Sequence, residues 1–255
     1  MKYAGYNGPH RSSRYPRLDA LRGAAVIWMV AFHFCFDLNY FRFIQQNFYL
    51  DPFWTTQRTA IVTLFLFCAG VSQAVAQAQG QNWSRFWKRW AQVAACALLV
   101  SASSWLIFGP RFISSGVLHA LALMLLLLRV LLHCWPAMTQ GKNVWGLVLV
   151  GGLCLLLPQW WQHPFFDARA TYWLGFATGK PATEDYVPLF PWLGVMLWGL
   201  AAGAWVMRFR PMWLQAGLTS ALQPLALVGR WSLSIYMLHQ PILFGILMAV
   251  IWLKR

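Results

Sequence analysis

The first apolar segment decides the fold, because ionisable side chains interrupt a stretch that is otherwise suited to a membrane. It reads DALRGAAVIWMVAFHFCFD over residues 19–37. Ten residues separate Arg22 from His33, which is almost three helical turns, so both side chains share one helix face about 16 Å apart along the axis. Asp19 and Asp37 fall on the same face. Ionisable groups inside a membrane are costly unless they are paired or wetted, so this polar stripe is the first functional candidate.

The composition predicts an integral membrane protein. Of the 255 residues, 59% are hydrophobic and only 10% are charged, whereas soluble domains carry about a quarter charged residues. The apolar residues gather in runs near the length of about 20 that spans a bilayer. We therefore expect an all-α, polytopic helical bundle in contact with lipid.

Seven apolar runs are predicted to cross the membrane within a single transmembrane domain, residues 17–255, which follows a basic cytoplasmic tail, residues 1–16. A short re-entrant or interfacial helix is expected in addition, within 168–176 or 212–228. The predicted crossings are 21–40, 59–78, 90–108, 117–135, 144–161, 190–207 and 232–253.

The net charge of +14 would point to nucleic acid in a soluble protein. Here the cations occupy short connections between apolar runs, and the positive-inside rule explains them without a ligand. This rule places the N-terminus in the cytoplasm, and the expected location is the bacterial inner (plasma) membrane. Lys254 and Arg255 then end on the outer side, an inconsistency that an additional re-entrant helix would remove. Nucleic acid is not an expected partner.

The cysteines predict neither a metal site nor a redox site. No pair has the close spacing of a zinc or redox motif, so buried thiols in helix packing are the simpler interpretation. We expect no metal. The five cysteines are Cys35, Cys68, Cys96, Cys134 and Cys154.

His33 is the leading candidate for catalysis. Asp37 stands four residues further along, where its carboxylate can orient one imidazole nitrogen. An oriented neutral imidazole can act as a general base or take an acyl group as nucleophile. The alternative is a structural histidine that bonds a neighbouring helix.

Arginines near the ends of the segments have a plain and a functional interpretation. Arg22 either snorkels to headgroups or clamps a phosphate or carboxylate. Asp19 either caps the helix, the commoner use, or pairs with Arg22. Arg58 and Arg230 are either topology anchors or, respectively, a partner of Asp37 and a site for a cytoplasmic anion.

Two further histidines and one long connection complete the candidates. His119 and His239 lie within apolar runs, and with the arginines they indicate a polar interior. The connection over 162–189 exceeds the usual length of a structureless loop. It predicts either a substrate-binding rim or lid, or an interfacial aromatic belt containing Trp160, Trp161, Tyr172 and Trp173.

Several motifs in this chain resemble the heparan-alpha-glucosaminide N-acetyltransferase catalytic-domain family, in the family's order and over nearly the whole chain after residue 16. The separation of Arg22 from His33 also resembles the wider transmembrane acyltransferases, including family-3 enzymes that acetylate surface polysaccharides. The motifs are RLDALRG (17–23), FHFCFDL (32–38), GVLHA (116–120), DYVPLFPWLG (185–194) and the stretch from Gly229-Arg230 to His239-Gln240-Pro241.

The resemblance implies an acetyltransferase that moves acetyl from cytoplasmic acetyl-CoA to a sugar or glycan acceptor on the periplasmic side. It implies that His33 is the catalytic histidine and that Arg22 lies on the donor side. From the positions of the remaining residues we expect Asp37 to assist His33 in catalysis. We also expect Arg230, His119 and His239 to contact the acyl donor, and Arg58 and Asp185 to contact the acceptor. The alternatives are a small-solute or proton-coupled transporter, in which the stripe relays protons, and a non-catalytic scaffold. Association into a homo-oligomer stays open.

Overall fold

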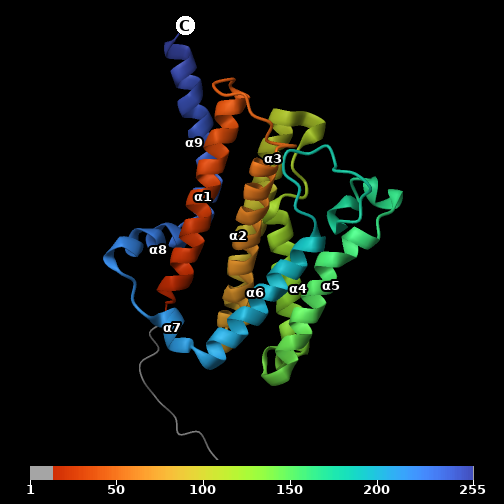
Figure 1. The fold of residues 1–255 in the computed structure, drawn as a ribbon, viewed down its shortest axis with the longest axis vertical. Coiled ribbons are helices and arrows are strands. Elements are labelled where there is room, and N and C mark those ends of the chain that lie inside the picture. The colour runs from red at the N-terminus through yellow and green to blue at the C-terminus, as the bar shows by residue number, and fades with distance from the viewer. Residues whose placement is uncertain (1–13, 255) are drawn as a thin grey trace, which may run out of the picture.

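The computed structural model describes residues 14–254 as a bundle of long helices (Figure 1). The predicted basic tail, residues 1–16, falls almost wholly outside the described residues, and the division into tail and single domain stays a prediction. Seven of the helices are long and apolar enough to cross a membrane, which confirms the predicted all-α bundle. They are α1 (Pro16–Tyr40), α2 (Pro52–Ala78), α3 (Trp83–Phe108), α4 (Val117–Cys134), α5 (Val144–Trp160), α6 (Leu189–Phe209) and α9 (Ser232–Leu253).

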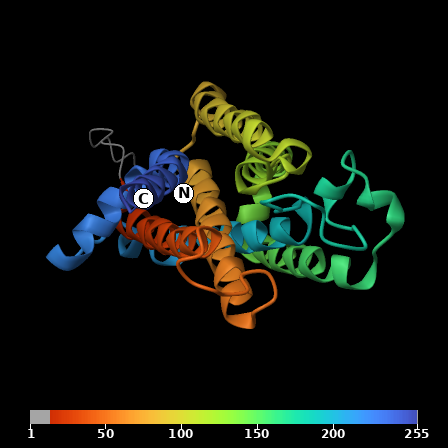
Figure 2. The ribbon, with the colours of Figure 1, turned by 90° about the horizontal axis from the view of Figure 1, so that it is seen from above.

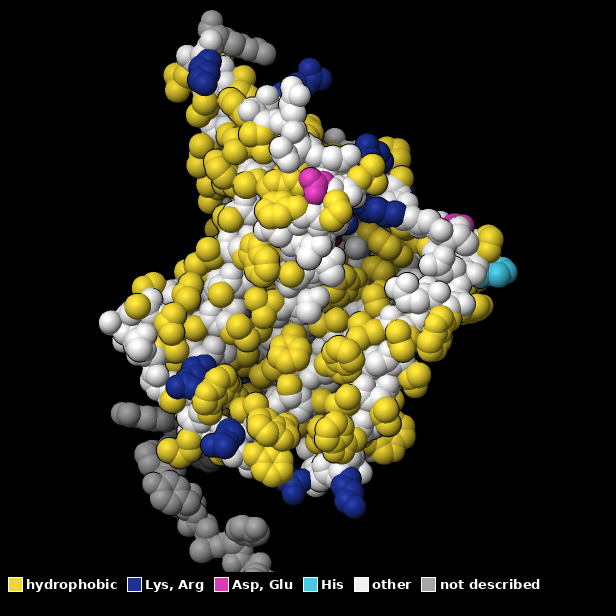
Figure 3. Space-filling view, viewed as in Figure 1, with side chains coloured by type: hydrophobic (Ala, Val, Ile, Leu, Met, Phe, Trp, Pro, Cys, Tyr) yellow, Lys and Arg dark blue, Asp and Glu magenta, His cyan; other side chains and the backbone are white. Residues whose placement is uncertain are grey.

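The bundle has two differently charged ends. One end, which we call the basic end, holds the start of α1 and the connections α2–α3, α4–α5 and α6–α7 (Figure 1). The opposite end, which we call the loop end, holds the connections α1–α2, α3–α4 and α5–α6. On the face shown in Figure 3, hydrophobic side chains are spread over the surface between the two ends, and Lys and Arg side chains lie mainly towards the ends.

The predicted additional helix is present only as short pieces. The stretch 212–228 contributes to α7 (Pro211–Gln215) and α8 (Gln223–Arg230), and the stretch 168–176 contains a single 3₁₀ turn, η5 (Tyr172–Leu174). None of these is long enough to cross a bilayer of about 30 Å. The C-terminal end of α9 therefore lies at the loop end (Figure 1), and Lys254 remains on the side that the charge rule disfavours.

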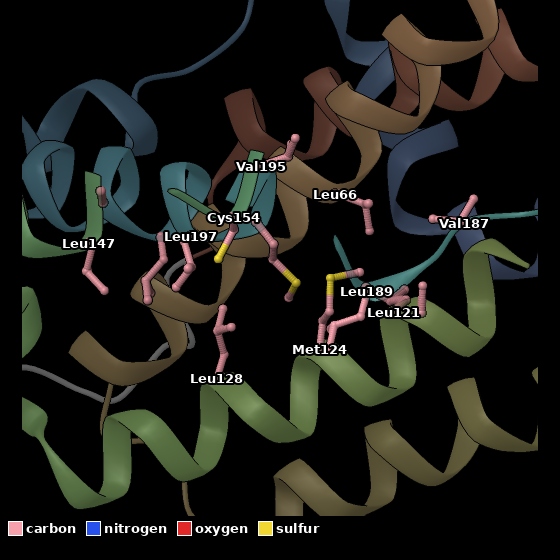
Figure 4. Close-up of a cluster of buried hydrophobic side chains, with 14 of the residues drawn as sticks. Leu66, Leu121, Met124, Leu128, Leu147, Cys154, Val187, Leu189, Val195 and Leu197 are labelled. Carbon is pink, nitrogen blue, oxygen red and sulfur yellow. The ribbon is translucent and has the colours of Figure 1, made fainter. Parts of the chain in front are cut away.

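The main hydrophobic core lies between α2, α4, α5 and α6 (Figure 4). Glycines let these helices approach backbone to backbone, as small residues do in membrane bundles. A Cβ built on Gly70 of α2 would lie 2.1 Å from the Met196 oxygen, and one on Gly199 of α6 would lie 2.2 Å from the Phe67 oxygen. Only a residue without a side chain fits at either position.

The long connection between α5 and α6 is bonded to the α3–α4 connection. The Val187 amide donates to the Ser115 oxygen at 2.8 Å, and the Thr183 hydroxyl donates to the Phe112 oxygen at 3.0 Å. The Tyr172 and Ser114 hydroxyls also bond each other. Tyr172 is therefore buried, and its assignment to an interfacial aromatic belt is wrong. Trp160, Trp161 and Trp173 are exposed, as that belt requires.

Candidate functional site

The polar stripe of α1 divides into two separate groups. At the basic end, the Arg22 guanidinium pairs with the Asp19 carboxylate at 2.8 Å. Asp19 makes no cap to the helix start, so the commoner role expected for this residue is wrong. About three turns further along, His33 and Asp37 face α9. The stripe thus provides an ion pair at one depth and a buried polar site at another.

His33 lies against a second histidine from the far end of the chain. The rings of His33 and His239 have their centroids 5.0 Å apart, and Figure 2 shows α1 and α9 side by side at this edge of the bundle. The Nδ1 of His239 lies 2.7 Å from the Tyr236 carbonyl oxygen. A carbonyl can only accept, so Nδ1 carries the hydrogen and the Nε2 of neutral His239 is left as an acceptor.

Asp37 does not orient His33, which corrects the expectation from their spacing. Its carboxylate is fully buried and accepts a hydrogen bond from Gln240 Nε2 at 2.8 Å. The expected ion pair with Arg58 is also wrong, because within residues 14–254 the recorded ion pairs join Arg22 to Asp19 and Arg111 to Glu184. Gln240 takes the place of the expected cation because α9, and not the start of α2, packs on this face of α1.

Four buried polar atoms at this contact have no hydrogen-bond partner among the described residues. They are His33 Nδ1, Asp37 Oδ2, His239 Nε2 and Gln240 Oε1. Each such atom costs about 1–3 kcal/mol, and native structures rarely keep them without a functional reason. Four at one helix contact mark a place where a reacting molecule can supply the missing partners.

The backbone brings α9 to α1 through a tight crossing. A Cβ on Gly23 of α1 would lie 1.9 Å from the Leu225 oxygen of α8, and a Cβ on Gly229 would lie 1.8 Å from the Asp19 oxygen. The crossing fixes the end of α8 on α1, and α9 begins two residues after α8 ends. Arg22 precedes Gly23 and Arg230 follows Gly229, so the two arginines predicted to contact the acyl donor are each next in the chain to a glycine of this crossing.

Aromatic side chains lie around the histidine pair. Phe32 contacts His33 edge to face at 5.8 Å, and Phe48 stacks on Trp54 at 4.0 Å next to Phe32. Tyr236 lies 5.8 Å from the His239 ring. These rings give His33 a largely apolar wall.

A second polar group gathers at the loop end and contains both residues predicted to contact the acceptor. Burial is the main cause that lowers the pKa of Lys180, and the nearby Arg58 lowers it further. Burial also raises the pKa of Asp185, against the influence of the Val117 amide, Arg58 and Lys180. Lys180 lies 5.1 Å above the ring of Tyr49. Arg58 and Asp185 therefore belong to one charged cluster, although Arg58 itself is exposed.

His119 belongs to a different place. Its Nε2 lies 2.9 Å from the Ser101 hydroxyl of α3, and that hydroxyl donates to the Ile113 oxygen at 2.7 Å. The bonds join α3 to the start of α4 and not to the α1–α9 contact. The structure thus brings His239 to His33 and leaves His119 elsewhere. Within the described part of the chain, no group of three His, Cys, Asp or Glu residues gathers that could hold a metal.

Gln240 and Tyr236 were missed in the sequence, although both lie in the motif that contains His239. The side-chain amide of Gln240, next to Pro241 within an apolar run, could have marked this stretch as a candidate site. Pro241 frees a backbone carbonyl one turn earlier, which disturbs the same stretch of α9.

The fold and the site define a polytopic membrane protein with a paired-histidine site between its first and last long helices. A family model described as "Heparan-alpha-glucosaminide N-acetyltransferase, catalytic" matches residues 14–241. The chain therefore belongs to this family, which indicates an acetyltransferase embedded in the membrane. Comparisons with curated proteins and with solved structures give no match.

Proposed function

We propose that this protein transfers acetyl from acetyl-CoA, bound from the basic end, to a hydroxyl or amine of a sugar acceptor that approaches from the loop end. The observation that carries the proposal is the contact of His33 with His239, in which one nitrogen of each ring is buried without a hydrogen-bond partner among the described residues. The family supports acetyl as the group that is moved.

His33 is the proposed general base or acyl carrier. As a base it takes the proton of the acceptor hydroxyl or amine while that atom attacks the thioester carbon. The carbon–sulfur bond then breaks, and the proton passes to the departing thiolate. As a carrier, the imidazole nitrogen first attacks the acetyl carbon, the carbon–sulfur bond breaks, and the thiolate leaves with the imidazole proton as the thiol. The acceptor then attacks the acetyl carbon, the carbon–nitrogen bond breaks, and the acceptor's proton returns to the imidazole. His239, with its tautomer set by the Tyr236 carbonyl, packs against the His33 ring.

The donor phosphates are assigned to the crossing of α1 and α8. Arg22 and Arg230 are the chain neighbours of Gly23 and Gly229 at this crossing, and a guanidinium binds phosphate oxygens in a bidentate manner. Arg22 is paired with Asp19 at 2.8 Å, so a bound phosphate competes with that carboxylate. The distance of about 16 Å along α1 between Arg22 and His33 requires a long, thin donor, such as acetyl at the end of a pantetheine arm.

The orientation follows from the charges of the two ends. Lys and Arg residues in the connections at the basic end outnumber the single carboxylate there, Asp19, and such connections face the cytoplasm. We assign the protein to a bacterial inner membrane with its N-terminus on the cytoplasmic side. We assign acceptor binding to the loop end, which contains Arg58 and Asp185.

The test measures transfer of labelled acetyl from acetyl-CoA to a mixed glycan pool by the purified protein in detergent. We expect transfer by the wild type, none above background with His33→Ala, and weaker acetyl-CoA binding with Arg22→Ala. His133→Ala is the matched control, because this exposed histidine of α4 contacts Trp83 and lies far along the chain from the site.

Two results would contradict the proposal. If the wild type neither binds nor turns over acetyl-CoA, the donor assignment fails, and proton-driven solute uptake by reconstituted vesicles would support the transporter alternative. If His33→Ala keeps full activity, the catalytic assignment fails while the enzyme class survives.

A further inference from the structure

An apolar groove runs along the outside of α5 and α6, away from the histidine pair. Its volume of about 580 Å³ lies within the usual range of about 300–1,000 Å³ for small-molecule sites. It extends along α6 from Trp198 to Phe209, which is about 16 Å at the rise of a helix. The groove ends at the basic end, where α5 begins and α6 finishes.

The walls of the groove are tryptophans and its floor is made of small residues. Trp145 of α5 and Trp205 of α6 are 69% and 52% exposed, and Trp198 is held by a 3.0 Å hydrogen bond from its indole nitrogen to the Val148 oxygen. Ala201 and Ala202 lie between these walls. Such a channel takes a flexible chain without polar groups.

Two cations stand at the basic mouth of the groove. Lys142 and Arg208 both line it and are both exposed, and an Arg208 nitrogen lies 3.8 Å from where a Cβ of Gly141 would be. Neither forms an ion pair with any residue of 14–254. The chain has only six carboxylates. Asp19 pairs with Arg22, and the others, Asp37, Asp51, Asp167, Glu184 and Asp185, lie in the outer half of α1 or in the connections at the loop end.

We propose that this groove binds one anionic phospholipid, with an acyl chain between the tryptophans and the phosphate between Lys142 and Arg208. An apolar channel that ends in two unpaired cations complements an amphiphile with a single negative head. Membrane surfaces with anionic lipids attract such cations, and phosphate oxygens accept charge-assisted hydrogen bonds from both. This lipid site does not depend on the proposed acetyl transfer.

The test uses native mass spectrometry of the delipidated protein, titrated with phosphatidylglycerol or with phosphatidylcholine that carries the same acyl chains. We expect the wild type to bind one phosphatidylglycerol about tenfold more tightly. The double variant Lys142→Gln/Arg208→Gln should lose this preference. The matched control Lys88→Gln/Arg89→Gln removes two exposed cations of α3 at the same end and should keep it. Ala202→Phe fills the floor and should weaken both lipids.

Each of the following four results would contradict the proposed lipid site. Equal binding of the two lipids by the wild type excludes a charge-selective groove. Equal loss in the control pair assigns the preference to the diffuse charge of the basic end. Release of the lipid by coenzyme A, with the wild type but not with the groove variant, assigns the two cations to a nucleotide. A protein dimer that the groove variants abolish in the absence of lipid assigns the face to a second copy of the chain.

Discussion

The α1–α9 contact and the α2–α6 contact both join two long helices, but they use different kinds of residue. Glycines at Gly70 and Gly199 bring α2 and α6 together through backbone atoms, and the surrounding side chains are apolar. The α1–α9 contact contains two histidines, an aspartate and a glutamine, and these leave four buried polar atoms without partners among the described residues. The first arrangement favours stability, and the second keeps unused hydrogen-bonding capacity where chemistry can use it.

The largest effect is expected when the imidazole of His33 on α1 is removed. We expect His33→Ala to lower the rate of acetyl transfer by about 10²–10⁴-fold, the usual contribution of a general acid or base. Thermal unfolding in detergent should hardly change, because the removed side chain has an unsatisfied buried nitrogen. A large drop in melting temperature would instead make His33 a structural residue.

At the α2–α6 contact we expect a substitution to lower the stability of the bundle. Gly199→Ala should destabilise the bundle by about 1–3 kcal/mol, the cost of overpacking, because its Cβ would lie 2.2 Å from the Phe67 oxygen. Thermal unfolding of a fluorescent fusion in detergent measures this loss. Gly152→Ala is the control, since a Cβ there meets nothing within 4 Å, and an equal effect of both variants would refute the packing argument.

A smaller effect is expected from the hydrogen bond that joins α1 to α9. Gln240→Leu removes the partner of Asp37, and interhelical hydrogen bonds in membranes contribute about 0.6 kcal/mol on average. We expect a slight loss of stability, together with a lower rate constant for acetyl transfer at unchanged acetyl-CoA affinity. Gln240→Asn keeps an amide that can donate to Asp37 and should restore part of the rate if the position of Asp37 matters, and a change in acetyl-CoA affinity alone would argue against positioning.

The smallest expected effect concerns pH at the loop end. Burial raises the pKa of Asp185 in the folded protein, so its contribution to stability is complete below the unfolded pKa and is lost as pH rises through the folded value. The wild type should therefore lose some stability as pH rises above about 4, the ordinary range of a carboxyl group. Asp185→Asn should flatten this part of the profile, and an unchanged slope would remove Asp185 as its source.

The crossings could be predicted from the chain because the membrane imposes a local rule. A run of about 20 apolar residues must form a helix whatever its neighbours are, since only a helix satisfies its own backbone in lipid. All seven runs became long helices. His33 was found in the same way, as an ionisable group on an apolar face.

The partners of these residues could not be predicted, because they depend on which helices touch. Spacing of four along α1 predicted that Asp37 orients His33, but the side chain turned to Gln240, more than two hundred residues away. For Asp19 the sequence left a helix cap and a pair with Arg22 as alternatives, and the structure shows the pair. His119 and His239 were indistinguishable as histidines in apolar runs, and only their neighbours, Ser101 and His33, separate them.

The sequence by itself determined a membrane bundle, the charge of its two ends and a polar stripe on the first helix, because hydropathy and helical period are properties of short stretches. Only the tertiary structure decided that the stripe divides between an ion pair and a histidine pair. That division depends on the α1–α8 crossing at Gly23 and Gly229, where two backbones meet that lie far apart in the chain. Long-range packing, and not local pattern, therefore placed His239 beside His33.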